Sequence, residues 1–162
     1  MTIVRNLEQQ SSNWTEGTVG SGSIVRGNSD TSAAMNREDG LSGINRRTLT
    51  LSNGEVIWDL AGNVWEWTDN TIIGRNQPTP NGEYTGLTSF GELSPERFLP
   101  TNSAWNSTQG YGIFSRGTLG ETTYVFIRGG YYGDSTNAGI LALDLGYESS
   151  STRAYVGFRF TR

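Results

Sequence analysis

Residues 128–159 read RGGYYGDSTNAGILALDLGYESSSTRAYVGFR, and this segment constrains the fold more than any other part of the chain. It combines a frame of glycine, apolar and arginine residues with intervals of polar and aromatic residues. The frame comprises Arg128, Gly129, Gly130, Ala138, Gly139, Leu141, Leu143, Leu145, Gly157, Phe158 and Arg159. Leucine at every second position predicts a strand over 139–145, with the leucines facing the core and Asp144 on the opposite face. Further strands are predicted over 124–128 and 154–160.

The intervals of this frame are rich in tyrosine, serine, glycine and aspartate. Recognition surfaces use these residues because they combine large amphipathic contact area with adaptable hydrogen bonding. We therefore predict one solvent-facing ligand-binding surface. Its residues are Tyr131, Tyr132, Gly133, Asp134, Ser135, Asp144, Gly146, Tyr147, Arg153 and Tyr155. The alternative for any single tyrosine is an ordinary half-buried strand residue with a polar tip.

The composition predicts one folded, loop-rich domain over 1–162. The chain has 162 residues, 22 glycines and five tryptophans, which favours short strands, few helices and a modest core over disorder. Its net charge is −4 and no basic run occurs, so nucleic acid is not an expected partner. No stretch reaches the roughly 20 apolar residues of a membrane span, so the chain is predicted to be soluble and not to insert into a membrane.

Cysteine and histidine are both missing from the sequence. This excludes a thiol nucleophile, a disulfide, an imidazole general base and any metal site built from these side chains. Together with the recognition-type composition of residues 128–159, this lack of catalytic groups points to binding before chemistry, and we expect a protein that is not an enzyme.

The rest of the chain gives weaker local patterns. Residues 1–10 predict a short amphipathic helix with Ile3, Val4 and Leu7 on one face, and residues 11–40 predict an irregular surface loop. Residues 46–58 predict a hairpin that turns at Ser52, Asn53 and Gly54. Residues 70–120 predict a long functional or insertion loop, since isolated aromatics within it need packing partners. Those aromatics are Phe90, Phe98, Trp105 and Phe114.

A tryptophan-rich motif precedes this long segment. Residues 58–67 read WDLAGNVWEW, and Gly62 and Asn63 predict a tight turn within it. Trp58, Trp65 and Trp67 are predicted to form a core cluster around that turn.

Three motifs in order carry a family resemblance: WDLAGNVWEW at 58–67, RGG at 128–130 and GFR at 157–159. Together they resemble the formylglycine-generating enzyme family, or sulfatase-modifying factor domain. The resemblance implies an α+β, C-type-lectin-like fold, loop-rich with short antiparallel strands. A segment that precedes the first helix in that family has no counterpart here, which implies a domain truncated at its N-terminal side.

The resemblance also bears on metal binding and activity. The glutamate that matches Glu66 binds calcium in enzymes of the family, which makes calcium a candidate cofactor here. The alternative is an ion pair of Glu66 with an arginine such as Arg159. The family's enzymes bind copper through a cysteine pair, and related sulfoxide synthases hold iron with histidines. This chain has neither residue, so the resemblance implies a retained scaffold without its chemistry.

Residues 128–159 resemble, more specifically, the variable region of proteins diversified by retroelements, in which a reverse transcriptase miscopies template adenines. The resemblance implies that variable positions descend from asparagine codons, which can become Tyr, Asp, Ser, Gly or Arg codons. Glu148 does not fit this rule, whereas the positions that fit are Tyr131, Gly133, Asp134, Ser135, Asp144, Gly146, Tyr147, Arg153 and Tyr155. Arg128 and Arg159 would be scaffold residues that fix loops.

The predicted function is therefore ligand binding, with an unknown protein or glycan as partner and an oligomeric state that the sequence leaves open. Display on a cell or virion surface would need parts outside this chain. Two alternatives remain. One is a calcium-dependent carbohydrate-binding module, and the other is a degenerate oxidoreductase of the formylglycine-generating type.

Overall fold

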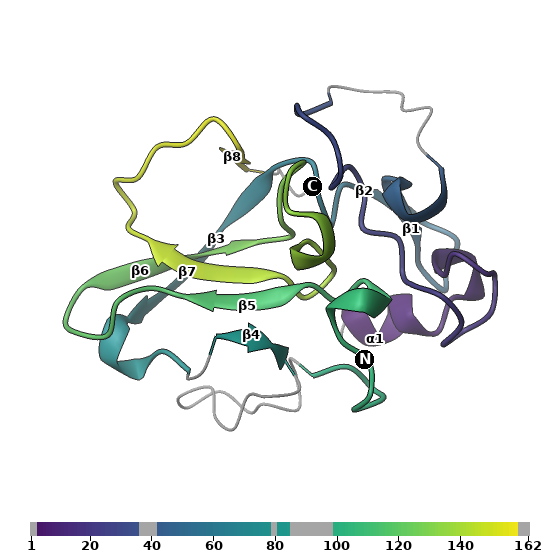
Figure 1. Cartoon of the computed structure of the whole chain (residues 1–162), viewed down its shortest axis with the longest axis horizontal. Coiled ribbons are helices and arrows are strands. Elements are labelled where there is room, and N and C mark those ends of the chain that lie inside the picture. Colours follow the sequence, from purple (N-terminus) through teal and green to yellow (C-terminus); the bar gives the residue numbers. More distant parts are fainter. Residues whose placement is uncertain (1–2, 36–41, 79–80, 85–98, 159–162) are drawn as a thin grey trace.

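The structure is a computed structural model that describes residues 3–35, 42–78, 81–84 and 99–158. These residues form an α+β, loop-rich fold with short strands and one short α-helix (Figure 1). The helices are α1 (Ile3–Glu8) and the 3-10 turns η1 (Ser11–Asn13), η2 (Gly43–Asn45), η3 (Gly74–Asn76), η6 (Ser107–Gln109) and η7 (Ser135–Asn137). The strands are β1 (Thr48–Thr50), β2 (Val56–Trp58), β3 (Trp65–Ile73), β4 (Gly82–Glu83), β5 (Ile113–Arg116), β6 (Thr123–Arg128), β7 (Leu143–Tyr147) and β8 (Val156–Gly157). Among the described residues, no helix is long and apolar enough to cross a bilayer.

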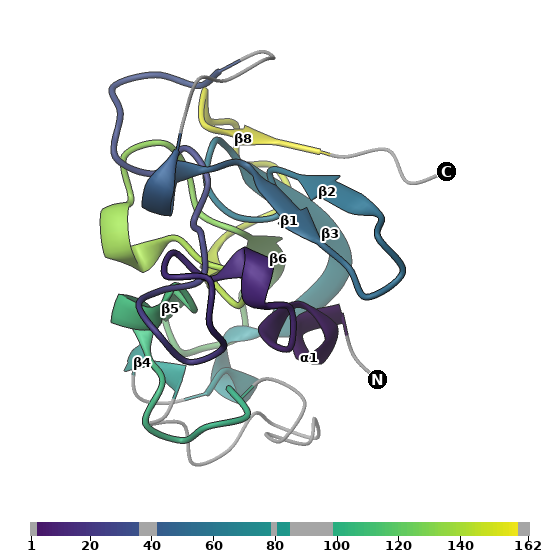
Figure 2. The same cartoon turned by 90° about the vertical axis from the view of Figure 1, so that its right-hand side faces the viewer.

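The described strands make two sheets. A mixed six-stranded sheet has the order β4-β5-β7-β6-β3-β8, in which β5–β7 and β3–β8 are parallel and the other neighbours are antiparallel. The β1–β2 hairpin forms a separate sheet at the right of Figure 1, and it faces the viewer in Figure 2. The parallel pairing of β3 with β8 brings the end of the described chain beside the tryptophan-rich motif.

The predicted hairpin is confirmed. β1 and β2 pair antiparallel with Thr48 opposite Trp58, and the Leu51 amide donates to the Glu55 carbonyl at 2.8 Å. Gly54 closes the turn at φ +85°, a conformation that glycine adopts without steric cost. A local turn signal therefore located this element correctly.

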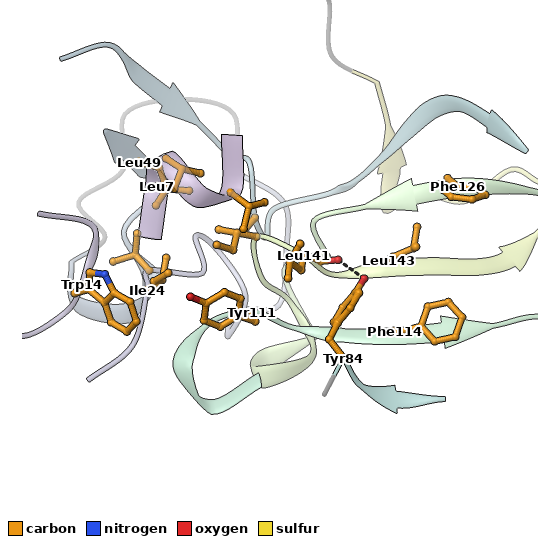
Figure 3. Close-up of a cluster of buried hydrophobic side chains, with 14 of the residues drawn as sticks. Leu7, Trp14, Ile24, Leu49, Tyr84, Tyr111, Phe114, Phe126, Leu141 and Leu143 are labelled. Atoms are coloured by element: carbon orange, nitrogen blue, oxygen red, sulfur yellow. Dashed lines mark hydrogen bonds between the residues drawn. The ribbon is translucent and has the colours of Figure 1, made fainter. Parts of the chain in front are cut away.

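The larger core cluster joins α1, β1 and the loops around them to β5, β6 and β7, and Figure 3 shows many of its side chains. Leu143 and Leu145 of β7 are fully buried, as the alternation predicted. The hydroxyl of buried Tyr84 donates to the Leu141 carbonyl, so this ring enters the core without leaving its polar group unpaired. On α1, Val4 and Leu7 are buried as expected, but Ile3 is exposed.

The predicted strand over 139–145 has the wrong start. Residues 139–142 form a turn in which the Ala142 amide donates to the Gly139 carbonyl at 3.0 Å, and β7 instead runs to Tyr147. The predicted strand over 124–128 is confirmed as β6. In the range predicted as the last strand, β8 covers only Val156–Gly157, and residues 159–160 lie outside the described residues.

The predicted surface loop over 11–40 is wrong in its middle part. Residues 23–29 are buried, because their backbone groups find partners inside the protein. The Ile24 amide donates to the Gln109 carbonyl at 3.0 Å, and the Val25 amide donates to the Asn13 carbonyl at 3.0 Å. Polar composition did not reveal this burial, since the hydrogen-bond partners are distant in sequence.

The segment 70–120 contains more regular structure than predicted. It holds the end of β3, η3, β4, η6 and β5. Trp105 packs between Trp14 and Tyr111, with ring centroids 4.9 and 5.9 Å away, and Phe114 is fully buried. These two aromatics therefore find the packing expected of them, whereas Phe90 and Phe98 lie outside the described residues.

Gly139 packs directly against another loop. A Cβ there would lie 2.2 Å from the Gly112 nitrogen and 2.3 Å from the Tyr111 carbonyl carbon. Both are backbone atoms that cannot rotate away, so Gly139→Ala is expected to lower the free energy of unfolding by about 2 kcal/mol or more. Gly157→Ala is the control, because its Cβ would meet only Val64 Cγ2 at 3.5 Å. Equal urea midpoints for the two variants would contradict this prediction.

Candidate functional site

The Gly62–Asn63 turn anchors the loop that carries the first two tyrosines of the predicted surface. Both residues have positive φ, +72° and +68°, as a tight turn requires. The Gly62 amide donates to the Gly129 carbonyl at 3.0 Å, and the Tyr132 amide donates to the Asn63 carbonyl at 3.1 Å. The predicted turn is thus confirmed, and its backbone holds the 129–132 segment in place.

The four tyrosines of the predicted surface form one connected cluster. The Tyr131 ring lies 5.0 Å from Tyr132 in an edge-to-face arrangement and 4.7 Å from Tyr155. The Tyr155 and Tyr147 hydroxyls are 3.2 Å apart and share a hydrogen bond. All four side chains are half-buried. We call Tyr131, Tyr132, Tyr147 and Tyr155 the tyrosine cluster.

A small apolar core supports the tyrosine cluster. Trp65, Val125, Ile127 and Ala142 are buried together, and Tyr131, Tyr147 and Tyr155 pack against them. The Trp65 amide donates to the Tyr155 carbonyl at 2.9 Å, next to the β3–β8 pairing. The inner edges of the rings are therefore fixed, while their remaining surface faces solvent.

Two aspartates border the tyrosine cluster. Asp134 Oδ2 accepts from the Tyr131 amide at 2.9 Å, and Asp144 Oδ1 accepts from the Gly146 amide at 2.6 Å. Burial raises the pKa of Asp134 to about 6; the hydrogen bond from Tyr131 opposes this rise and the negative charge of Asp144 adds to it. Burial also raises the pKa of Asp144. The charge of Asp144 thus acts on Asp134, and both carboxylates lie at the border of the tyrosine cluster.

One cation joins the same surface. The Arg153 guanidinium lies 5.5 Å from the centre of the Tyr147 ring, within the range of a cation–π contact. The hydrogen bond with Tyr155, followed by desolvation, raises the pKa of Tyr147 to about 12. Tyr147 therefore stays protonated at neutral pH and can donate a hydrogen bond.

The raised pKa of Asp134 predicts a pH-dependent stability. Between its ordinary value of 3.8 and about 6, the folded protein keeps a proton that the unfolded chain has lost. The stabilisation is therefore complete below about pH 4 and is lost as the pH rises through about 6. Asp134→Asn is expected to be more stable than the unmodified protein at pH 7 and equally stable near pH 4.

Urea unfolding at a series of pH values measures this difference. The asparagine keeps an oxygen that can accept from the Tyr131 amide, so the substitution changes mainly the charge. Parallel stability curves for the two proteins across this pH range would rule out the assignment.

Of the other predicted surface residues, Gly133 lies in the turn after Tyr132, Ser135 begins η7, and Gly146 lies on β7. Gly133, Ser135 and Gly146 are exposed, and Ser135 adopts φ +51° at the start of η7. The structure thus brings all ten predicted surface residues to one region, and it buries none of them fully.

A neighbouring segment escaped the sequence prediction. The Thr31 amide donates to the Tyr132 carbonyl at 2.8 Å, and the Ser135 amide donates to the Ser29 carbonyl at 2.8 Å. Residues 29–31 therefore hold the backbone of the loop that carries Tyr132 and Ser135. No sequence signal pointed to them, because they lie in a polar stretch a hundred residues away along the chain.

Glu66 does not join the tyrosine cluster. On β3 it lies between Trp65 and Trp67, which pack toward the cluster's core, so its side chain projects from the other face of the sheet. There it lines a groove, and the strand register places it opposite Arg128. In the described parts of the chain, no group of three or more acidic side chains could hold a metal ion. Arg159, its alternative partner, lies outside them.

The predicted tryptophan cluster is correct for two of its three members. Trp65 is buried and Trp67 is half-buried against the same core. Trp58 is 46% exposed, which contradicts its predicted burial. It stands at the end of an edge strand, 5.8 Å from the Arg47 guanidinium.

No protein-family model matches the chain, and no curated protein matches it.

Proposed function

We propose that this chain is a non-catalytic ligand-binding protein with a C-type-lectin-like fold, and that the tyrosine cluster and its charged border bind the ligand. One observation carries the proposal. Four tyrosine rings from separate segments of the chain converge into one half-exposed group: Tyr131 with Tyr132, and Tyr147 with Tyr155. Rigid aromatic rings supply large contact area at low entropic cost.

The packing supports a division between a fixed scaffold and a variable face. Ala138 and Leu141 are buried, and along β7 the buried Leu143 and Leu145 alternate with the half-buried or exposed site positions Asp144, Gly146 and Tyr147. Side chains on the solvent side can change without altering the core. This arrangement is what a surface diversified by a retroelement requires, and we propose that origin for residues 128–159.

The gene offers a direct test of this origin. A near-identical copy of the 3′ end of the coding sequence, differing only at adenines and lying beside a reverse transcriptase gene, would support diversification. Adenine-independent differences, or a neighbourhood without such a copy, would remove the argument for the retroelement but would leave the binding surface open to test.

A library tests the binding surface itself. The library varies five outward positions together, and each position takes only residues that mutated asparagine codons encode. The positions are Gly133, Ser135, Asp144, Gly146 and Arg153. Library members are then selected for binding to an arbitrary target protein. We expect most members to keep a melting temperature within a few degrees, since surface changes cost under about 0.5 kcal/mol each. We also expect binders to emerge. A library of largely unfolded members would reject the proposal.

Two matched measurements address the alternative functions. A glycan array read with and without a chelator tests calcium-dependent sugar binding, for which Glu66 is the candidate ligand. Copper titration with a thiol-peptide turnover assay tests the oxidoreductase alternative. We expect neither chelator-sensitive glycan binding nor turnover of the thiol peptide.

A further inference from the structure

A second surface of this protein has the features of a binding site, and it is distinct from the tyrosine cluster. A groove of about 1490 Å³ lies between the β1–β2 hairpin and β3 of the large sheet. Six large apolar side chains are exposed in the described residues, and four of them line this groove: Ile3, Val56, Trp58 and Phe158. Apolar side chains gathered in this way mark interaction sites, whereas singly scattered ones do not.

One wall of the groove is β2, which pairs on one side with β1 and has no strand partner on its other side among the described residues. The Asp59 amide donates to the Arg47 carbonyl and the Leu51 amide donates to the Glu55 carbonyl, which sets the hydrogen-bonding phase of the hairpin. In an antiparallel pair, every second residue directs its backbone amide and carbonyl away from the partner strand. In this register, the backbone amides and carbonyls of Val56 and Trp58 therefore point away from β1.

The two edges of the hairpin differ. On β1 the outward Thr50 amide and carbonyl both bond the Asn13 side chain, at 2.7 and 2.8 Å. On β2 no hydrogen bond within the described part of the chain engages the outward groups of Val56 and Trp58. An edge of this kind is a template for an added strand.

The charge of the groove indicates the chemistry of its occupant. Its lining includes four carboxylates and one guanidinium. Asp59 pairs with Arg47, and Glu66 lies opposite Arg128 in the register. Glu55 and Asp69 are exposed and have no ion-pair partner among the described residues. The rim is therefore acidic, and it complements a basic partner.

Two other occupants fit less well. A second copy of this chain in a two-fold dimer would place the same acidic rim against itself, which like-charge repulsion opposes. The groove also exceeds the roughly 300–1,000 Å³ of a typical small-molecule pocket.

We propose that this groove binds an extended peptide segment of a partner protein. The segment adds to the free edge of β2, places alternate apolar side chains beside Val56 and Trp58, and sets arginine or lysine against Glu55 and Asp69. This peptide site is separate from the ligand-binding site proposed at the tyrosine cluster, and the two sites can be occupied at the same time.

The test uses the full chain and a short series of fluorescent peptides, acetyl-Arg-X-Thr-X-Thr-X-Arg-amide, with X as valine, leucine or phenylalanine. Fluorescence anisotropy is expected to show saturable binding of at least one peptide. Trp58→Ser should weaken that binding about tenfold or more, and Glu55→Lys should weaken it while reducing its dependence on salt. Leu119→Ser is the matched control, because Leu119 is equally exposed but does not line the groove.

Backbone N-methylation distinguishes strand addition from simple apolar contact. Two versions of the binding peptide carry methyl groups on the odd or on the even amides. Because only one set of amides faces β2 in an added strand, one version should lose binding and the other should keep it. Sedimentation of the unmodified protein and Trp58→Ser reports any self-association through this face.

Four results would overturn the proposal. They are no binding of any peptide in the series, equal binding to Trp58→Ser, equal affinity of the two methylated versions, or a dimer that Trp58→Ser dissociates. The last result would assign the groove to a second copy of the chain.

Discussion

Replacement of Trp65 by alanine is expected to lower the free energy of unfolding by about 3–5 kcal/mol. The Trp65 ring is only 7% exposed and packs with Val125, Ile127 and Ala142, so its loss leaves a cavity beneath the tyrosine cluster. The lost stability has two parts: the large ring is no longer buried, and the surrounding strand residues cannot move in to fill the cavity. Urea unfolding at fixed pH measures it.

Trp58→Ala is the matched control for this prediction. It removes the same side chain from an exposed position whose main identified contact is the Arg47 guanidinium. A cation–π contact at an exposed site contributes about 0.5–1 kcal/mol, so a loss of about 1 kcal/mol or less is expected. If the two substitutions were equally destabilising, the position of Trp65 in the core would be wrong.

Truncation of a central tyrosine is expected to have the largest effect on binding. Tyr131 contacts the rings of both Tyr132 and Tyr155, so Tyr131→Ala removes the middle of the proposed surface. Against a ligand captured by this face, the substitution should weaken affinity by about 2 kcal/mol or more, roughly thirty-fold. Titration calorimetry measures the loss, and thermal unfolding verifies that the variant stays folded.

Two further variants separate the contribution of a tyrosine hydroxyl from that of its ring, and the contribution of the tyrosine cluster from that of the surrounding loop. Tyr155→Phe keeps the ring but removes the hydrogen bond to the Tyr147 hydroxyl, so a smaller loss is expected than for Tyr131→Ala. Ser150→Ala changes an exposed loop residue outside the tyrosine cluster and should be nearly silent. Small, even losses at every position would contradict a surface with an aromatic centre.

Much of the local structure could be predicted because it depends on neighbours in sequence. The turn residues of the 46–58 segment located a hairpin, and Gly62 with Asn63 located a tight turn of positive φ. The alternating Leu143 and Leu145 identified a buried strand face correctly. The start of that strand was misplaced, because residues 139–142 form a turn in which the Ile140 and Leu141 amides donate to the distant Gly110 and Tyr111 carbonyls.

The candidate site was predictable as a set of residues but not as a geometry. The composition of the C-terminal segment identified Tyr131, Tyr132, Tyr147 and Tyr155 as candidates. No local sequence pattern predicts that the first two tyrosines contact the last two. They meet because β8 pairs parallel with β3, which returns the chain to the Trp65 backbone after a long loop. The support that residues 29–31 give to the Tyr132 loop depends on long-range hydrogen bonds as well.

The sequence by itself determined that this chain has no thiol or imidazole group, where its tight turns fall and which residue types its C-terminal segment carries. Only the tertiary structure decided which side chains those turns bring together, that Trp65 is buried while Trp58 is exposed, and that β2 pairs only with β1 among the described strands. The physical reason is that turns and alternation follow from local steric preferences, whereas burial depends on which distant strand supplies the missing hydrogen bonds and packing surface.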